Sequence, residues 1–396
     1  MSAIGVQTGL LTVLLAAAFS CAPPLSASKN LDRQAQALMR LGAMVSIRYE
    51  TGAASGLEVT LPQEPEAVRK AIWALLSSSE AVVIGLDVAG NTLSDLEAQA
   101  VRRLSNLRCI VFERKQSEKV YLSLKGLHRL KTVVIRHAAI GPAVATVIAG
   151  AKEVERLDLT GARIAPAELR TILRNPRLRE LYFLCDHLGD DMVRAIGEAR
   201  RLKVLALLGI AKGAKGLGNL TALEVLAVGG LESAADFEEI GTMNGLRTLY
   251  LRGRLGEAGL AAVHLPRGLE AVALSCRQLS PRILGELMSC ENLKQVSLSL
   301  QRFSKSDLGA LAAMPRLERL MLSTEEPLDV KPADFKRFPK LKELGVAWWG
   351  TEYARYVSEL KETLPATRIS EDIPDTVTSW YEDPRTFCRS RGDVPK

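Results

Sequence analysis

The stretch Val154-Glu-Arg-Leu157-Asp-Leu159 is followed, 24 residues after its first residue, by Leu178-Arg-Glu-Leu181-Tyr-Phe183. Each stretch has apolar residues at offsets 0, 3 and 5 from its first residue, and another apolar residue follows at offset 10. A fixed internal period of this length indicates a repeat protein, in which each unit buries its apolar face against its neighbours.

The same pattern recurs over most of the chain, at intervals of 21 to 24 residues. A chance pattern would not keep its period over so long a stretch, so the repeats decide the architecture. A weaker thirteenth copy covers Leu364 to Ile369. The twelve clear copies begin at Val83, Leu107, Leu130, Val154, Leu178, Leu202, Leu223, Leu246, Leu269, Leu293, Leu317 and Leu341.

Each unit is expected to hold one strand and one short helix. Apolar residues at offsets 3 and 5 alternate with solvent-facing ones, which is the period of a strand with one buried face. Beyond offset 10 the apolar period becomes three or four, which is the stripe of a helix. Helix starts are marked by proline at the first position, by an N-cap serine and by first-turn acids. These signals are Gly141-Pro142, Ala165-Pro166, Ser280-Pro281, Asp95 and Asp190.

The repeat resembles the leucine-rich repeat family, in particular the bacterial exported kind with 23–24-residue units. The resemblance covers Ala81 to Ser370 and implies an α/β fold, a curved solenoid with a parallel sheet on its concave side and short helices outside. Many members carry asparagine at offset 8, where it bonds the turn backbone from inside. Here only Asn91 stands there; other copies have Lys115, Ala138, Ala162 or Arg254. The remaining turns must therefore satisfy their backbone in another way.

Residues 1–28 carry no charged side chain and include the apolar run Leu10 to Phe19. This run fits the core of a secretory signal, with Leu25-Ser-Ala27 as its cleavage site, and predicts an exported protein of the periplasm, cell envelope or medium. Two alternatives stay open. Cys21 loosely resembles the lipid-bearing cysteine of bacterial lipoproteins, or the segment is an uncleaved anchor or no targeting signal at all.

Two short regions flank the predicted solenoid, 81–370. Residues 29–80 are expected to form an N-terminal cap, with helices at Leu31–Leu41 and Glu64–Leu76 and a hairpin between them. At the far end, Trp348, Trp349, Tyr353 and Tyr356 are expected to cover the last repeat. Residues 371–396 lose the period and are rich in charge, proline and serine, which predicts a flexible tail.

No catalytic, cofactor or metal site is predicted. Cys185-Asp186-His187 with Asp190-Asp191 is rich in metal-binding side chains, but the repeat already assigns Leu188 to the core and Asp190 to a helix start. The glycines between Gly209 and Gly218 fail the spacing of a phosphate loop and lie in the 21-residue unit, so they predict a tight turn with little helix.

The six cysteines form no evident disulfide framework. Cys276 and Cys290 share one repeat and could meet, but a strand and a helix of one unit are expected to point them in different directions. The remaining cysteines are interpreted as small buried or half-buried residues.

The net charge of +7 comes with a row of basic residues at offset 1, interrupted by Glu155, Glu224, Glu270 and Glu318. This row is either an ordinary solvated rim or a surface for an anionic glycan or cell-wall polymer. Nucleic acid is not expected, because aromatic residues do not interleave with the basic ones.

The concave face carries the main functional hypothesis. Offsets 2, 4 and 6 point away from the core, and in the copies from Leu202 and Leu223 these positions hold no charge. A contiguous apolar patch on a soluble protein indicates a binding site, here for a protein or peptide and without catalysis. The alternative is that these short side chains only accommodate curvature or meet a loop of the same chain. The candidate binding residues are Tyr182, Leu184, Val204, Leu208, Val225, Tyr250 and Arg252.

Overall fold

The computed structural model describes residues 25–50, 53–63, 66–78, 82–185, 187–207, 210–211, 213–229, 231, 234–252 and 263–370. The apolar run near the N-terminus, Cys21, Leu208 and the segment 371–396 lie outside these residues, so the export signal and the flexible tail stay predictions. No helix in the described ranges is long and apolar enough to cross a membrane.

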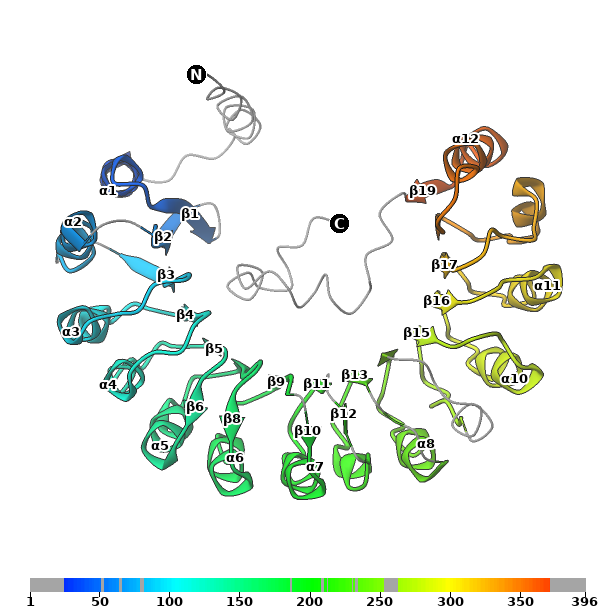
Figure 1. The fold of residues 1–396 in the computed structure, drawn as a ribbon. Coiled ribbons are helices and arrows are strands. Elements are labelled where there is room, and N and C mark those ends of the chain that lie inside the picture. The colour runs from blue at the N-terminus through cyan, green and yellow to red at the C-terminus, as the bar shows by residue number, and fades with distance from the viewer. Residues whose placement is uncertain are drawn as a thin grey trace.

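A sheet of fifteen described strands forms the inner side of an arc (Figure 1). Strands of the twelve clear copies are parallel and pair at equal offsets, so that Leu205 lies beside Leu226 and Leu226 beside Leu249. All twelve predicted copies and the weak thirteenth contribute a strand. These are β3 (Val83–Asp87), β4 (Cys109–Phe112), β5 (Thr132–Ile135), β7 (Arg156–Asp158), β9 (Glu180–Phe183), β11 (Val204–Leu207), β13 (Val225–Gly229), β14 (Thr248–Arg252), β15 (Ala271–Ser275), β16 (Gln295–Leu300), β17 (Arg319–Thr324), β18 (Glu343–Ala347) and β19 (Arg368–Ser370).

Helices form the outer side of the arc (Figure 1). They start as the sequence predicts: Ser280 Oγ accepts a hydrogen bond from the backbone nitrogen of Ile283 at 3.3 Å, and Pro281 is the first helical residue. The helices are α3 (Asp95–Arg103), α4 (Glu118–Leu122), α5 (Pro142–Gly150), α6 (Pro166–Leu173), α7 (Asp190–Gly197), α8 (Ala234–Gly241), α10 (Pro281–Ser289), α11 (Lys305–Ala312), α12 (Tyr353–Thr363) and the 3₁₀ turns η1 (Leu217–Asn219) and η2 (Pro332–Arg337).

Short strand pairs join some strand ends to the helices that follow. β6 (Ala139–Ile140) pairs with β8 (Arg163–Ile164) at equal offsets, whereas β10 (His187–Leu188) pairs with β12 (Ile210–Ala211) with a shift of one offset at the 21-residue unit. The offset-10 residues Ile140 and Ile164 therefore stack on each other, as the strand residues do.

The main core lies between the sheet and the helices. Leu205, Leu226 and Leu249 at offset 3 are each 0% exposed. Burying one such side chain contributes about 1.5–3 kcal/mol, and every repeat supplies several of them. The leucine pattern therefore sets both the strand register and the stability of the stack.

The N-terminal region extends the same sheet. The hairpin of β1 (Met44–Glu50) and β2 (Ala53–Thr60) is antiparallel, and β2 pairs in parallel with β3. Helices α1 (Leu25–Arg40) and α2 (Glu66–Leu76) flank the hairpin. The predicted start of the first helix, Leu31, is wrong, because α1 already begins at Leu25.

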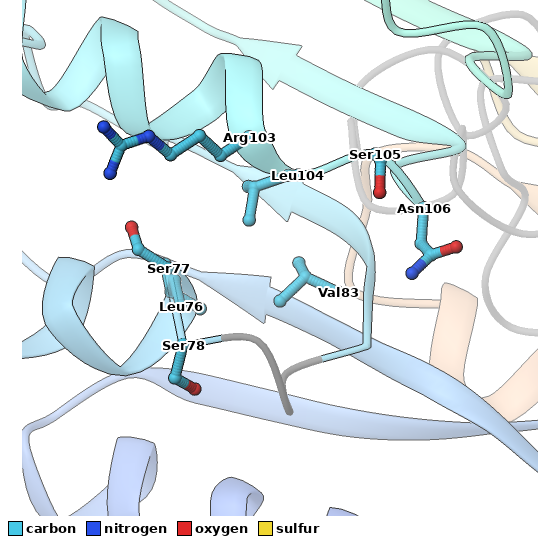
Figure 2. A pocket seen from close by; sticks show the side chains of 8 residues that line it. All are labelled: Leu76, Ser77, Ser78, Val83, Arg103, Leu104, Ser105 and Asn106. Carbon is cyan, nitrogen blue, oxygen red and sulfur yellow. The ribbon is translucent and has the colours of Figure 1, made fainter.

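A hollow of about 150 Å³ lies between the loop after α2 and the loop after α3 (Figure 2). Leu76, Val83 and Leu104 contribute apolar surface, and three serines and Asn106 contribute polar surface. Arg103 is the one charged residue that lines this hollow in the described chain. No carboxylate or histidine of the described residues lines the hollow.

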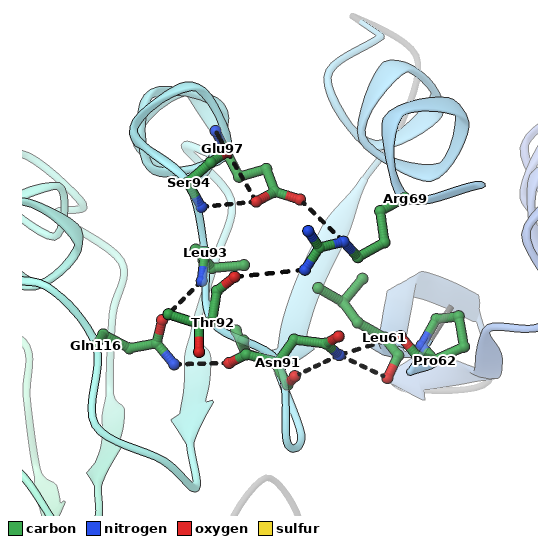
Figure 3. Close-up of polar contacts among 10 residues, drawn as sticks. Leu61, Pro62, Arg69, Asn91, Thr92, Leu93, Ser94, Glu97 and Gln116 are labelled. Carbon is green, nitrogen blue, oxygen red and sulfur yellow. Dashed lines mark hydrogen bonds and ion pairs between the residues drawn. The ribbon is translucent and has the colours of Figure 1, made fainter. Parts of the chain in front are cut away.

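Two amide side chains hold the first repeats together (Figure 3). Asn91 Nδ2 donates to the carbonyl oxygens of Val88 at 3.0 Å and Pro62 at 3.1 Å. Gln116 Nε2 donates to the carbonyl of Asn91 at 2.7 Å, and Gln116 Oε1 accepts from the backbone nitrogen of Leu93 at 2.8 Å. Gln116, at offset 9 of the next copy, thus supports a turn from the neighbouring repeat.

At the far end, an aromatic cluster covers the last repeats. The Trp348 ring packs edge-on against Tyr353 and Tyr356, with ring centroids 5.2 Å and 5.0 Å apart. The hydroxyl of Tyr356 donates to the carbonyl oxygen of Val330 at 2.7 Å. The prediction that Trp349 joins this cover is wrong, because its side chain is 92% exposed.

Candidate binding surface on the concave sheet

The outward-facing residues of the central strands form one apolar row. Strand register places Tyr182, Ala206, Ala227, Tyr250 and Ala273 side by side at offset 4 on β9, β11, β13, β14 and β15. Two tyrosines therefore flank two alanines, so large side chains border short ones. Together with Val204, Val225 and Leu184, this row is named the concave apolar cluster; it is separate from the main core.

These side chains are more enclosed than an open patch would be. Tyr182 and Tyr250 are each 7% exposed and Val204 is 4% exposed, while Leu184 and Val225 are half-buried. The helices lie on the other side of the sheet (Figure 1). The concave apolar cluster thus behaves as a second core on the inner side of the arc, and it continues towards β4 through Val111 and Val134.

The structure brings together five of the seven candidate binding residues: Tyr182, Leu184, Val204, Val225 and Tyr250. Leu208 lies outside the described residues. The backbone of Arg252 pairs with Gly229 in the sheet, but the position of the Arg252 side chain is not described.

Charged residues border the cluster on its N-terminal side. Asp158 shares the row of Tyr182 and is fully buried, with one carboxylate oxygen 2.8 Å from Arg136 Nη2. Its other oxygen accepts a hydrogen bond from the backbone nitrogen of Thr160 at 2.8 Å. Glu180 forms an ion pair with Arg156 at 2.7 Å and accepts a hydrogen bond from the Tyr182 hydroxyl at 3.1 Å.

The buried ion pair between Asp158 and Arg136 was not predicted from the sequence. The signal was an acid at offset 4 of one copy and an arginine at offset 6 of the copy before it, Asp158 and Arg136. Alignment of the outward offsets of neighbouring copies would have placed the two side chains together.

The row at offset 1 is a ladder of ion pairs. Lys203 lies 2.7 Å from Glu224, Lys294 lies 2.9 Å from Glu270, and Lys342 lies 2.9 Å from Glu318. The hydrogen bond from the lysine lowers the pKa of Glu270 and, in the same way, the pKa of Glu318. The glutamates that interrupt the basic row therefore neutralise part of it.

In the described part of the glycine-rich turn, carboxylates bind three of the backbone amides. Glu239 Oε1 accepts hydrogen bonds from the backbone nitrogens of Gly216 at 2.9 Å and Gly218 at 3.0 Å. Asp236 Oδ1 accepts from the backbone nitrogen of Ala214 at 2.6 Å. Carboxylates of α8 thus occupy the amides that a phosphate would need, and the unit carries the three-residue turn η1 in place of a longer helix, as its shortened length predicts.

In the segment from Cys185 to Asp191, the described residues have the structural roles that the repeat predicts. Leu188 is 1% exposed in the core and Asp190 is the first residue of α7. Asp186 and the side chain of His187 lie outside the description. Within the described ranges, no group of three histidine, cysteine or acidic side chains is placed to hold a metal ion.

The cysteines differ in chemical state. Cys276 and Cys290 are free and buried, and burial raises the pKa of each thiol to about 11. Cys185 is half-buried and forms no disulfide. Cys109, which is 5% exposed on β4, is disulfide-bonded. The prediction that the cysteines are only small buried residues is therefore wrong for Cys109.

Solved structures share this fold. The chain aligns with TLR13, in its complex with single-stranded RNA, at 16% identity and a TM-score of 0.53, over 82% of this chain and 49% of that chain. An internalin from Listeria monocytogenes aligns at 12% identity and a TM-score of 0.43, over 81% and 87% of the two chains. A leucine-rich repeat protein from Leptospira interrogans aligns at 15% identity and a TM-score of 0.37, over 85% and 98%.

No protein-family model and no curated protein sequence matches the chain. It spans about half the length of the TLR13 chain, so that likeness concerns the fold alone. This chain is a leucine-rich repeat solenoid.

Proposed function

We propose that this chain is a non-catalytic scaffold that binds a protein or peptide through its concave sheet. The observation that carries the proposal is the concave apolar cluster, an uncharged row on the sheet face opposite the main core. Tyrosines such as Tyr182 and Tyr250 are favoured anchors at interfaces, because they combine a large apolar ring with a hydroxyl. Their strands are fixed by the leucine stack, so little ordering entropy is lost on binding.

A surface for an anionic glycan or cell-wall polymer is the alternative function. The net charge of +7 favours it, but the lysine–glutamate pairs at offset 1 reduce the positive potential of the rim. Salt separates the two functions, because binding to a charged rim weakens as the ionic strength rises and apolar contact does not.

Export is part of the proposal. A disulfide at Cys109 persists in an oxidising compartment and would be reduced in most cytosols. Mass spectrometry of the mature protein, purified from its own cells, tests this. A chain that begins after Ala27 is the expected result. A lipid on Cys21 would show an anchored form, and an intact N-terminus would contradict processing.

The binding test uses cross-linked affinity capture with the full chain as bait, in lysate of the native organism at low and high salt. One protein retained at both salts is expected, and Val225→Asp and Tyr250→Ala should each weaken its capture at least about tenfold. Leu96→Asp on the outer helix α3, where Leu96 is 73% exposed, is the matched control. Unchanged capture by folded Val225→Asp and Tyr250→Ala variants would contradict the proposal that the concave face binds the partner.

A further inference from the structure

The disulfide at Cys109 lies on the proposed binding face. Cys109 stands at offset 2 of β4, between Gly85 and Thr132 of the neighbouring strands, and belongs to the same apolar group as Tyr182 and Tyr250. Its bonding partner is therefore a segment that reaches the inner side of the arc.

Elimination leaves two partners within this chain. The sequence has six cysteines, and Cys185, Cys276 and Cys290 form no disulfide. The remaining ones are Cys21, four residues before α1, and Cys388, eighteen residues after the end of β19 at Ser370.

The reach of the chain favours Cys388. β4 is the fourth and β19 the fifteenth strand in the sheet, which is eleven steps, or about 53 Å across the strands at about 4.8 Å per step. Eighteen residues span up to about 60 Å when extended. A segment from Ser370 that follows the inner side of the sheet can therefore reach Cys109, and it then passes over Tyr250 and Tyr182.

Cys21 is less well placed. Four residues span about 14 Å at most, and α1 lies on the outer side beside α2 (Figure 1). The segment before α1 would have to pass around the end of the sheet to reach the face of Cys109. Cleavage after Ala27, as the sequence predicts, would also remove Cys21 from the mature chain.

The composition of the last 26 residues suits the concave apolar cluster. In a chain with only 5% aromatic residues, this segment contains Trp380, Tyr381 and Phe387, and Phe387 directly precedes Cys388. Such side chains can bury apolar surface against Val204, Val225 and their neighbours.

We propose that residues 371–396 occupy the concave face as an internal ligand, tethered by a disulfide between Cys388 and Cys109. The proposal rests on the proposed binding function, because it makes this segment the competitor of an external partner. The tether holds the segment at a millimolar effective concentration. Reduction of the disulfide would free the face for binding.

Formation of the bond needs an external disulfide, from a thiol–disulfide oxidoreductase or a small-molecule disulfide. The thiolate of one cysteine attacks that disulfide and releases one external thiol, leaving a mixed disulfide. The thiolate of the second cysteine then attacks the mixed disulfide and releases the second external thiol. Two cysteine thiols are thus oxidised, one external disulfide is reduced, and the two protons pass to the released thiols.

Peptide mapping of the full exported chain tests the linkage. Thiols are blocked with N-ethylmaleimide in acidic denaturant, so that buried Cys276 and Cys290 also react, and the chain is cut with trypsin without reduction. Cys109–Arg114 linked to Thr386–Arg389 is the expected product. Cys109 linked to the peptide that ends at Lys29, or Cys109 carrying the blocking group, would overturn the proposal.

Capture of the partner tests the competition. Cys388→Ser should strengthen capture about tenfold or more, because it lowers the effective concentration of the internal segment. Cys185→Ser is the matched control. Equal capture by Cys388→Ser and the wild type would overturn the role as competitor even if the bond is present. No capture by either chain, with the linked peptides still found, would contradict the proposed function and leave the tether standing.

Discussion

Strands β7 and β9 can be compared with strands β11 and β13, because the same repeat builds both pairs. Towards the helices the two regions are alike, since Leu157, Leu181, Leu205 and Leu226 are each 0% exposed. On the concave side they differ. β7 and β9 carry the ion pairs of Asp158 and Glu180, whereas β11 and β13 carry only valine, alanine and glycine at the outward positions of the described strands.

The difference shows which positions the fold controls. Offsets 3 and 5 are fixed by burial in the stack, and any polar residue there would disrupt it. The outward offsets are free to vary, but a charge placed among them must find a partner, as Asp158 finds Arg136. Where no charge is present, the outward residues merge into one apolar surface, and this is the region proposed to bind.

The largest expected effect comes from removing Asp158. Asp158→Ala leaves Arg136, whose side chain is 11% exposed, without its carboxylate, and should cost about 3–5 kcal/mol of the free energy of unfolding. Urea titration followed by circular dichroism measures this. The double change Arg136→Met with Asp158→Leu should recover most of the loss, because two apolar side chains replace the charges. A loss below about 1 kcal/mol for Asp158→Ala would show that the buried pair does not support the N-terminal region.

The next comparison separates the two faces of one strand. Leu226→Ala opens a cavity in the main core and should cost about 2–5 kcal/mol of the free energy of unfolding. Val225→Ala, at a half-buried outward position, should cost less than about 1.5 kcal/mol but should weaken partner capture. Urea titration and capture of both variants under folded conditions provide the measurement. Weaker capture by Leu226→Ala than by Val225→Ala would place the binding residues elsewhere.

The sequence predicts the stacked core in detail. Equal spacing decides which residues pair, as in Leu205 beside Leu226, and local helix signals such as Ser280-Pro281 need no knowledge of the neighbours. The polar contacts between repeats were not predicted. Gln116 binds the turn at Asn91, which lies 25 residues before it in the sequence. Glu239 binds the glycine turn at Gly216 and Gly218, which lie 23 and 21 residues before it. Such contacts depend on how adjacent units are placed, which a single repeat does not encode.

Substitution of Gln116 should reduce stability less than Leu226→Ala does. Gln116 is 4% exposed and both donates and accepts a hydrogen bond, so Gln116→Ala leaves the nitrogen of Leu93 and the carbonyl of Asn91 without these partners. The expected cost is about 1–3 kcal/mol of the free energy of unfolding, measured by urea titration. Gln116→Glu keeps the acceptor and loses the donor, so its cost should fall between wild type and Gln116→Ala. Equal stability of all three chains would mean that water replaces the amide.

The smallest effect concerns the ion pairs at offset 1. A hydrogen bond from Lys294 lowers the pKa of Glu270 from its ordinary value of 4.5, and the charge of Arg247 acts in the same direction. Because this pKa is lower in the folded than in the unfolded chain, the stabilisation is present above pH 4.5 and is lost as the pH falls through the folded value.

The wild-type chain should therefore have a higher free energy of unfolding than Glu270→Gln above about pH 4.5. The difference should be small, and high salt should reduce it further. Thermal unfolding at a series of pH values measures the difference. Glu155→Gln is the matched control, since Glu155 stands at the same offset and makes no ion pair with another described residue. A difference that persists into more acidic solution would mean that Glu270 acts through packing and not through charge. Glu270 would then stabilise the fold by a different interaction from that of Asp158, because the buried pair of Asp158 and Arg136 acts through its charges.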